Sequence, residues 1–412
     1  MNILHISGAG IESGAGKATI LTHEALLSFG KINSKILFLN ENVDLDENIY
    51  SISNISILNK IKRFVYTTLD RIPTVFYTKK KSMIFSSGFF GHDIKKIELF
   101  EWADIIHIHW ANHGMINISQ INKWGKPIVW TLRDMWAFTG GCHHSLECIN
   151  YKYQCKECQL LGSSSNYDLS TYCFNRKHKI LINSNITWVA ISSWMQKVAS
   201  ESLILSNSKI SIIFSGIRTD IFIPHSKFEV RQEFGIPLNA KVILIGAANL
   251  TDEYKGGKYI IDVLEKCTVE IYVVSFGILN SFAFTNKKIK LLNFGYITDD
   301  TKLAKIYSTA DTFLAPATNE AFGKTVAEAQ SCGVPVLCFA ETGPSDIVEH
   351  LITGYMAKYQ NIEDLMNGFL FCLNHQFDHF YIRNRVVNLF DINITATNYQ
   401  DIYTSIYKNN IS

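Results

Sequence analysis

The sequence predicts an α/β protein with two similar doubly wound domains, each built on a parallel sheet. The chain opens with a short apolar run, Asn2–Ile6, a glycine-rich loop and a helical pattern from Ala18 to Phe29. This order is typical of the start of such a domain. The order begins again at Lys241–Ala247, and strands alternate with helical stretches afterwards, which favours parallel sheets. A length of 412 residues fits two or three domains.

The composition narrows the class of protein. Apolar residues make up 47% and charged residues 18% of the chain, which is typical of a globular protein, and a net charge of +2 argues against a nucleic-acid partner. The first ten residues have no basic lead and only a short apolar run, so we expect a first strand and no signal peptide. No apolar run approaches the ~18 residues that span a bilayer. We therefore expect a cytoplasmic protein.

The first loop, Gly8–Lys17, comes close to two phosphate-binding motifs. A Walker A loop would need Gly at position 11 and Ser or Thr at position 18, where the chain has Ile11 and Ala18. A dinucleotide fingerprint would need Gly at position 13, which is Ser13. The loop still offers backbone amides beside a helix start, which suits an anion, and a simple tight turn is the alternative. The residues that would face the anion are Gly14, Ala15 and Gly16.

Polar side chains follow two later strands of the first domain. Ile105–His109 is expected to be a strand, and Trp110 and Asn112 come directly after it. Ligands of open α/β sheets lie at the carboxyl ends of the strands, so we expect His109, Trp110 and Asn112 to line a ligand-binding cleft. Pro127–Leu132 is the next strand.

Arg133 and Asp134 end that strand and are expected to face the same cleft. An arginine side chain is permanently charged and forked, so Arg133 could clamp a diphosphate or an acidic sugar.

Two features could bind a metal ion. Asp44-Leu45-Asp46 resembles the metal clamp of a different transferase fold, although an ordinary acidic loop is the simpler interpretation. A cluster of cysteines ends in a Cys-x2-Cys pair, and four thiolates can converge on a tetrahedral structural zinc; free thiols or a disulfide are the alternatives. The expected ligands are Cys142, Cys148, Cys155 and Cys158.

Residues 60–96 hold nine Lys or Arg against two Asp, with aromatic residues interleaved. Such a segment could lie on an anionic membrane surface, with basic side chains reaching the headgroups and aromatic rings inserted. An ordinary solvated helix with one core-facing side is the alternative.

The second domain carries the densest group of candidate ligand-binding residues. Thr312–Ala315 is expected to be a buried strand, followed by a loop with Glu320 and a helix with Glu328. The first turn of a helix has unpaired amides and a partial positive charge, which attract an anion such as phosphate. A carboxylate on each side could then hold sugar and ribose hydroxyl groups. The residues that open the helix are Ala321, Phe322, Gly323, Lys324 and Thr325.

These motifs resemble a known family. Two glutamates eight positions apart after a strand, with Gly333–Pro335 closing the helix, resemble the donor-binding motif of the family 4 retaining glycosyltransferases of the GT-B fold. Lys255 before Gly256 resembles the lysine that this family places on the donor diphosphate. Residues 130–148, WTLRDMWAFTGGCHHSLEC, resemble a subgroup that acts in bacterial surface-polysaccharide biosynthesis, such as capsule, O-antigen or colanic acid. Many relatives have His at the place of Arg133, so this chain departs from the pattern there.

The resemblance implies two Rossmann-like domains that face a cleft, and a C-terminal helix that crosses back to the first domain. We expect an acceptor domain at 1–205, a nucleotide-sugar donor domain at 206–385 and a returning helical segment at 386–412.

The resemblance also implies a reaction. A sugar would pass from a nucleotide-diphosphate sugar to a lipid-linked saccharide acceptor at the inner face of the membrane, with retention of configuration and without a required cofactor. Catalysis would involve Glu320, Lys255, Arg133 and Asp134, while Glu328 would bind the ribose. A sugar-nucleotide epimerase of the same fold, or a non-catalytic nucleotide-binding module, are the alternatives.

Overall fold

The computed structural model describes residues 1–39, 47–81, 83–182, 184–279 and 284–411. The chain forms two compact units. Unit 1 comprises Met1–Gly216 together with Asn393–Ser412, and unit 2 comprises Ile217–Ile392. Asp44 and Asp46, the possible metal clamp, lie outside the described residues. Each unit is a parallel sheet with helices, so the predicted α/β class with two Rossmann-like domains is confirmed.

Unit 1 is built on a seven-stranded sheet with the order β3-β2-β1-β4-β5-β6-β7. Neighbouring strands run parallel, and His5 lies opposite His107 in the register of β1 and β4. The central strands β1, β4 and β5 are almost entirely buried, as expected for a parallel sheet covered on both faces. Their bounds are β1 (Asn2–Ser7), β2 (Asn33–Phe38), β3 (Ile49–Ser51), β4 (Ile105–Trp110), β5 (Ile128–Leu132), β6 (Ile186–Ala190) and β7 (Ile210–Ile212).

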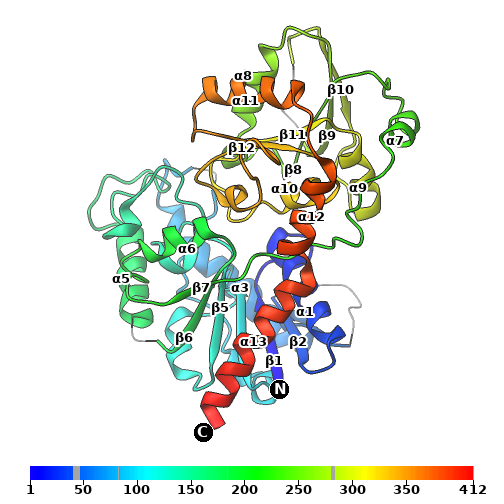
Figure 1. The fold of residues 1–412 in the computed structure, drawn as a ribbon. Coiled ribbons are helices and arrows are strands. Elements are labelled where there is room, and N and C mark those ends of the chain that lie inside the picture. Colours follow the sequence, from blue (N-terminus) through cyan, green and yellow to red (C-terminus); the bar gives the residue numbers. More distant parts are fainter. Residues whose placement is uncertain (40–46, 82, 183, 280–283, 412) are drawn as a thin grey trace. The chain divides into compact units, whose positions relative to one another are not determined.

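The last helix of the chain packs on the sheet of unit 1 (Figure 1, red). Its Tyr399 and Tyr403 are buried and meet Thr131 on β5 and His107 on β4. This helix therefore completes the core of unit 1. The helices of unit 1 are α1 (Gly14–Ser28), α2 (Ile52–Ile55), α3 (Ile57–Val75), α4 (Glu98–Trp102), α5 (Leu169–Leu181), α6 (Ser193–Ser200) and α13 (Ile392–Ile411).

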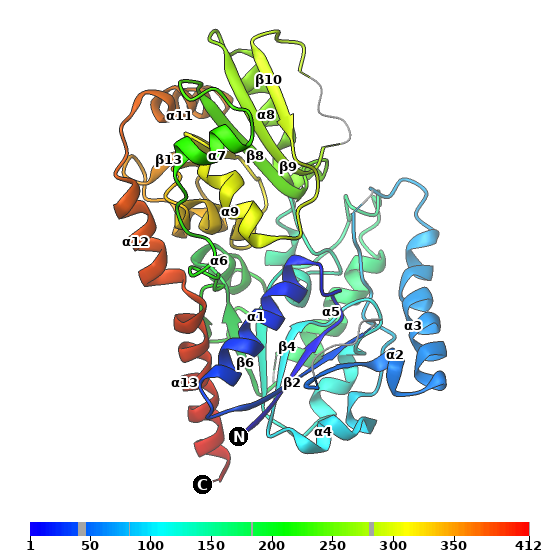
Figure 2. The same cartoon turned by 90° about the vertical axis from the view of Figure 1, so that its right-hand side faces the viewer.

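Unit 2 is built on a six-stranded parallel sheet with the order β10-β9-β8-β11-β12-β13. Its main apolar core lies between this sheet and the helices α8 and α11, while α9, α10 and α12 lie on the other face (Figures 1 and 2). The strands are β8 (Val242–Asn249), β9 (Ile271–Ile278), β10 (Ile289–Asn293), β11 (Thr312–Ala315), β12 (Val336–Phe339) and β13 (Gly354–Ala357). The helices are α7 (Lys227–Glu233), α8 (Gly257–Glu265), α9 (Asp300–Ser308), α10 (Lys324–Ser331), α11 (Ile362–Asn374) and α12 (His379–Phe390).

Short 3-10 helices connect several of these elements. They are η1 (Ile94–Lys96), η2 (Ile118–Lys123), η3 (Trp136–Phe138), η4 (Asn150–Lys152), η5 (Glu253–Lys255) and η6 (Gly343–Asp346).

The chain passes between the units after Gly216 and after Ile392, later than the divisions expected at 205 and 385. Residues 206–216 stay with unit 1 because β7 pairs with β6, with Ile210 opposite Trp188. Helix α12 stays with unit 2 because the Arg383 side chain donates hydrogen bonds to the backbone oxygens of Phe222 and Ser331. Among the described residues, no helix is long and apolar enough to cross a membrane.

Candidate functional site

The first group of candidate residues lies in unit 2, where Lys255 meets Glu320. Lys255 ends η5, which follows β8, and Glu320 lies in the loop after β11. The Lys255 Nζ is 2.6 Å from the Glu320 Oε2, and about a fifth of each side chain is exposed. The two predicted residues are thus in direct contact and partly open to solvent.

Gly256 allows this contact to form. Its φ is +77°, in the left-handed region that favours glycine, and a Cβ atom there would lie 1.9 Å from the backbone oxygen of Pro316. The η5 turn can therefore press against the loop that follows β11, which carries Glu320.

The electrostatics of the pair keep Lys255 charged. Burial alone would lower the pKa of Lys255, but the Glu320 carboxylate and Tyr254 raise it above its ordinary value. Lys255 is therefore a stable cation, suited to stabilising a negatively charged group.

A second ion pair lies at the start of α10. Gly323, with φ at +97°, precedes the helix, and Lys324 and Glu328 face each other one turn apart with 3.1 Å between Nζ and Oε1. The Tyr307 hydroxyl donates a hydrogen bond to the Glu328 Oε2 at 2.9 Å. An ionised carboxylate has about four acceptor positions, so Glu328 keeps capacity for further hydroxyl donors.

Glu328 is buried, with only 3% of the residue exposed. Burial raises the pKa of Glu328 above its ordinary value, although Lys324 and Tyr307 oppose the rise. Its ion pair with Lys324 and the hydroxyl of Tyr307 offset the cost of placing a carboxylate there.

The predicted anion site coincides with the first turn of α10. Val326 and Ala327 donate their backbone N–H groups to the oxygen of Gly323, whereas the amides of Lys324 and Thr325 have no acceptor among the described residues. Phe322 is buried and packs against Phe390, which anchors the loop. The start of α10 thus holds the open amides, Lys324 and Glu328, and the preceding loop carries Glu320, which contacts Lys255 of η5.

The glycine loop of unit 1 differs from the prediction. Helix α1 begins at Gly14 and not at Ala18, because the Ser13 side chain accepts a hydrogen bond from the Gly16 amide and caps the helix. A Cβ at Gly16 would lie 2.1 Å from the Gly10 oxygen, so glycine is required for this close turn. Gly14, Ala15 and Gly16 thus form the first turn of α1, and one of their three amides is already satisfied by the cap.

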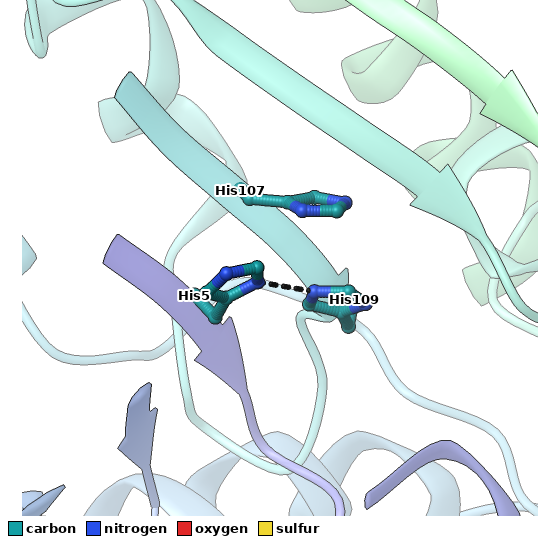
Figure 3. A group of neighbouring side chains, drawn as sticks. All are labelled: His5, His107 and His109. Carbon is teal, nitrogen blue, oxygen red and sulfur yellow. Dashed lines mark hydrogen bonds between the residues drawn. The ribbon is translucent and has the colours of Figure 1, made fainter. Parts of the chain in front are cut away.

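A cluster of three buried histidines contacts Arg133. Figure 3 shows His5 on β1 and His107 and His109 on β4, and their ligand atoms lie within 4.8 Å of one another. The Arg133 Nε and Nη2 atoms lie 3.2 and 2.9 Å from the His109 Nδ1. Because arginine can only donate, this nitrogen must accept, and the proton of His109 sits on Nε2. His109 therefore donates to the His5 Nδ1 at 2.8 Å.

His107 is held by hydroxyl groups on both sides. Its Nε2 lies 2.7 Å from the Thr131 hydroxyl, and its Nδ1 lies 2.6 Å from the Tyr403 hydroxyl. Tyr399 in turn hydrogen-bonds Thr131 at 2.7 Å. Two tyrosines of α13 therefore fix His107, and the neighbouring His109 holds Arg133.

The histidine cluster is electrically neutral. Burial, the neighbouring rings and the Arg133 charge lower the pKa of His5, His107 and His109 well below the ordinary value. Three histidines could in principle bind a metal ion, but both nitrogens of His109 and both of His107 already have protein partners. The geometry therefore fits a scaffold that positions Arg133 better than a metal site.

Asp134 is a structural anchor within the same region. Its Oδ2 accepts hydrogen bonds from the Trp110 Nε1 at 2.6 Å and contacts the His143 Nδ1 at 2.7 Å, while its Oδ1 accepts from the Trp136 amide. Burial would raise the pKa of Asp134, but His143 and the Trp136 amide lower it below the ordinary value. Asp134 thus ties Trp110 in place as an ionised group. Asn112 is buried, and its Oδ1 has no partner among the described residues.

The four cysteines form no disulfide. Burial is the largest cause that raises the pKa of Cys142, to about 12, and neighbouring thiols add to the rise. Among the described residues, His5, His107 and His109 form a group of three possible metal ligands whose ligand atoms lie within 4.8 Å of one another. No three of the four cysteine sulfur atoms, all in the described part of the chain, come this close together, so the cysteines do not form a preformed metal site. A zinc ion bound by Cys142, Cys148, Cys155 and Cys158 stays a prediction.

The sequence analysis did not predict three residues that contact the candidate site residues or their supports. Tyr307 contacts Glu328, and Tyr399 and Tyr403 support the histidines. The only signal for the last two was their spacing of four residues, which places them on one side of a helix.

Unit 2 matches a family of known enzymes. Residues 226–385, which lie within unit 2 and make up less than half of the chain, match the family described as "Glycosyl transferases group 1". The D-inositol 3-phosphate glycosyltransferase of Mycobacteroides abscessus is 27% identical over 175 residues, which are 38% of this chain and 37% of that protein. The O-antigen biosynthesis glycosyltransferase WclY of Escherichia coli is 28% identical over 192 residues, 44% of this chain and 54% of that protein. The matched part is less than two thirds of the length of either relative.

The fold of the whole chain also has solved counterparts. The crystal structure of HepE from Anabaena in complex with UDP and glucose aligns with 98% of this chain and 100% of that chain. The TM-score is 0.62 and the sequence identity 13%, so the likeness concerns the fold. The two-unit architecture is that of the GT-B glycosyltransferases.

Proposed function

We propose that this protein transfers a sugar from a nucleotide-diphosphate sugar to a lipid-linked saccharide acceptor. The observation that carries the proposal is the arrangement in unit 2, where Glu320 and Glu328 flank the open amides that begin α10. Each of these carboxylates is paired with a lysine. The segment also lies within the part of the chain that matches the glycosyltransferase family.

In the proposed reaction, unit 2 stabilises the leaving diphosphate. Lys255 and the amides of Lys324 and Thr325 would meet the phosphate oxygens on which negative charge develops as the sugar departs. Lys255 lies 2.6 Å from Glu320 in the structure, so a phosphate would replace this carboxylate as the partner of Lys255. Glu320 is then free to hold hydroxyl groups of the transferred sugar.

Glu328 would bind the ribose diol with its remaining acceptor positions, while Tyr307 and Lys324 fix its orientation. Arg133 would contact the diphosphate or an acidic group of the sugar, as a cation whose direction is set by His109. Asp134 would keep Trp110 at the end of β4 in position.

We further propose that the reaction retains the anomeric configuration and requires no metal, as in the family 4 enzymes that the sequence resembles. Two lysine side chains next to the proposed phosphate position can provide the charge that a divalent cation would supply elsewhere.

A panel of nucleotide sugars tests the proposal. The purified full-length protein is incubated with UDP-, GDP-, ADP- and dTDP-sugars, with and without a lipid extract as the source of acceptor, and the released nucleoside diphosphate is measured. We expect acceptor-dependent release with one donor, and NMR of the product should show the anomeric configuration of that donor. Glu320→Gln should reduce the release strongly, and Glu363→Gln, at an exposed position of α11, is the matched control.

Two outcomes would overturn the proposal. An epimerised donor that appears without nucleotide release would indicate the epimerase, and tight nucleotide binding without turnover of any donor would indicate the non-catalytic module.

A further inference from the structure

Helix α3 packs on unit 1 through its polar side. The Thr67 hydroxyl donates to the His113 backbone oxygen at 3.0 Å. Asp70, only 2% exposed, accepts hydrogen bonds from the Ser87 hydroxyl and the Gly88 amide. The ring of Tyr66 meets that of His92 edge to face. The inward side of the helix is therefore held by polar contacts, in contrast to an ordinary surface helix.

The outward side of α3 is apolar. Ile57, Phe64 and Val75 are 81%, 69% and 66% exposed, and the helical period places them on one side of the helix. Figure 2 shows α3 at the edge of unit 1, with one side not covered by other elements of that unit. Monomeric proteins rarely leave such a continuous apolar strip in water, so the strip indicates an interaction surface. Further exposed apolar residues of the strip are Leu58, Ile61, Val65, Ile72 and Phe76.

Positive charge flanks the strip. Residues 57–81 contain seven Lys or Arg and a single acid, Asp70, which is buried and accepts hydrogen bonds from Ser87 and Gly88. The whole chain has a net charge of only +2, so this segment concentrates the basic charge. Lys60 and Arg71 lie on one edge of the strip and Lys62 on the other, by the same helical period. The segment Lys79–Lys81 adds three more basic residues just beyond the helix.

We propose that residues 57–81 dock on the surface of an anionic lipid bilayer. The apolar strip would enter the boundary between headgroups and acyl chains, and the flanking lysines and arginines would extend to the lipid phosphates. A second copy of the chain fits the strip less well, because the basic edges of two copies would repel each other. The inference does not depend on the proposed sugar transfer.

Vesicle sedimentation tests this inference with the full-length protein and no donor present. We expect binding to phosphatidylcholine vesicles that contain phosphatidylglycerol, little binding to phosphatidylcholine alone, and weaker binding as salt rises from ~0.05 to ~0.5 M. The double variant Ile61→Ser/Phe64→Ser should lose at least about tenfold in partitioning without a change of charge. Phe228→Ser/Phe380→Ser, at exposed apolar positions of unit 2, is the matched control and should bind as the wild type.

A second pair of variants tests the charges. Lys60→Gln/Arg71→Gln should weaken binding about tenfold and reduce its salt dependence, whereas Lys266→Gln/Lys287→Gln, which removes the same charge from exposed positions of unit 2, should not. All these positions are exposed, so the thermal unfolding midpoint should stay unchanged.

Absence of binding to the anionic vesicles at both salt concentrations would overturn the inference. So would equal binding by the Ile61→Ser/Phe64→Ser variant, or a concentration-dependent dimer that this variant abolishes without any effect on vesicles. None of these results would bear on nucleotide release, which is measured separately.

Discussion

The two units hold their candidate functional charges in different ways. In unit 2 both candidate lysines have a carboxylate partner, since Lys255 pairs with Glu320 and Lys324 pairs with Glu328. In unit 1 Arg133 is held by His109, which is neutral, and no carboxylate pairs with Arg133 among the described residues. The adjacent Asp134 is directed to other groups.

This difference suggests different tasks. The pairs of unit 2 are balanced before a ligand arrives, so binding exchanges one partner for another. Arg133 is a cation with a fixed direction and an unbalanced charge, which favours the arrival of an anion. The following experiments test this contrast, from the largest expected free-energy change to the smallest.

Acidification should destabilise unit 1 through its neutral histidines. The pKa values of His5, His107 and His109 are well below those of the unfolded chain, ~6.5, so below that pH the unfolded chain takes up protons that the folded unit does not. Stability is complete above pH ~6.5 and is lost as the pH falls towards the folded values. Between pH 7.5 and 5.5 we expect these three histidines to contribute a loss of about 4 kcal/mol, from about 1.4 kcal/mol per histidine.

The chain offers a specific probe for this measurement. All seven tryptophans lie between residues 102 and 194, so tryptophan fluorescence during urea unfolding reports on unit 1. The variant His5→Gln, which can still accept from His109, should remove about 1.4 kcal/mol of the pH effect. A stability of unit 1 that is unchanged from pH 7.5 to 5.5 would show that the cluster is not neutral.

Glu320→Ala should reduce turnover about 100-fold or more, the size of a lost preorganised contact. The variant also leaves Lys255 without its partner, so nucleotide affinity should change less than turnover or even rise. The measurement is kcat and KM with the donor identified by the panel, with Glu363→Gln as the control. Turnover at the wild-type level would remove Glu320 from the proposed site.

Arg133→Ala should lower kcat/KM by about 10- to 100-fold, the value of one or two charge-assisted hydrogen bonds. Arg133→Lys keeps the charge but loses the fork, and should recover only part of the activity. If Arg133 instead serves only the fold of unit 1, both variants will shift the fluorescence unfolding curve while kcat/KM of the folded fraction stays normal.

Glu328→Ala should mainly weaken donor binding, about tenfold, because it removes a contact to the ribose that is present before and during the reaction. Calorimetric titration with the nucleoside diphosphate measures this loss. Tyr307→Phe, which removes only the hydroxyl that holds Glu328, should show a smaller loss in the same direction. Wild-type affinity in Glu328→Ala would contradict the assignment of this residue to the ribose.

Much of the fold could be predicted from local patterns. The order strand, loop and helix that was expected after Asn2 and after Lys241 is present in both units. The strand Thr312–Ala315 has the bounds expected. Glu320 and Glu328 could be proposed from their spacing around a strand and a helix start, which is a local feature, whereas Lys255 was proposed from the resemblance to a family; the roles of all three stay predictions.

The contacts of unit 1 could not be predicted in this way. His5 lies within an apolar run, and only the register of β1 with β4 brings it to His109. Tyr403 reaches His107 across almost the whole chain. The periodicity of α3 defines an apolar and a polar side, but it does not reveal that the polar side faces the domain, because this depends on acceptors and donors supplied by distant segments.

The return of α13 to unit 1 affects the order in which the protein can mature on the ribosome. Unit 2 is continuous in sequence, so its core is available as soon as residue 392 has left the exit tunnel. The sheet of unit 1 is synthesised earlier, yet His107 and Thr131 lack their tyrosine partners until α13 emerges. The nascent chain can therefore complete unit 2 before unit 1, the reverse of the usual amino-terminal order.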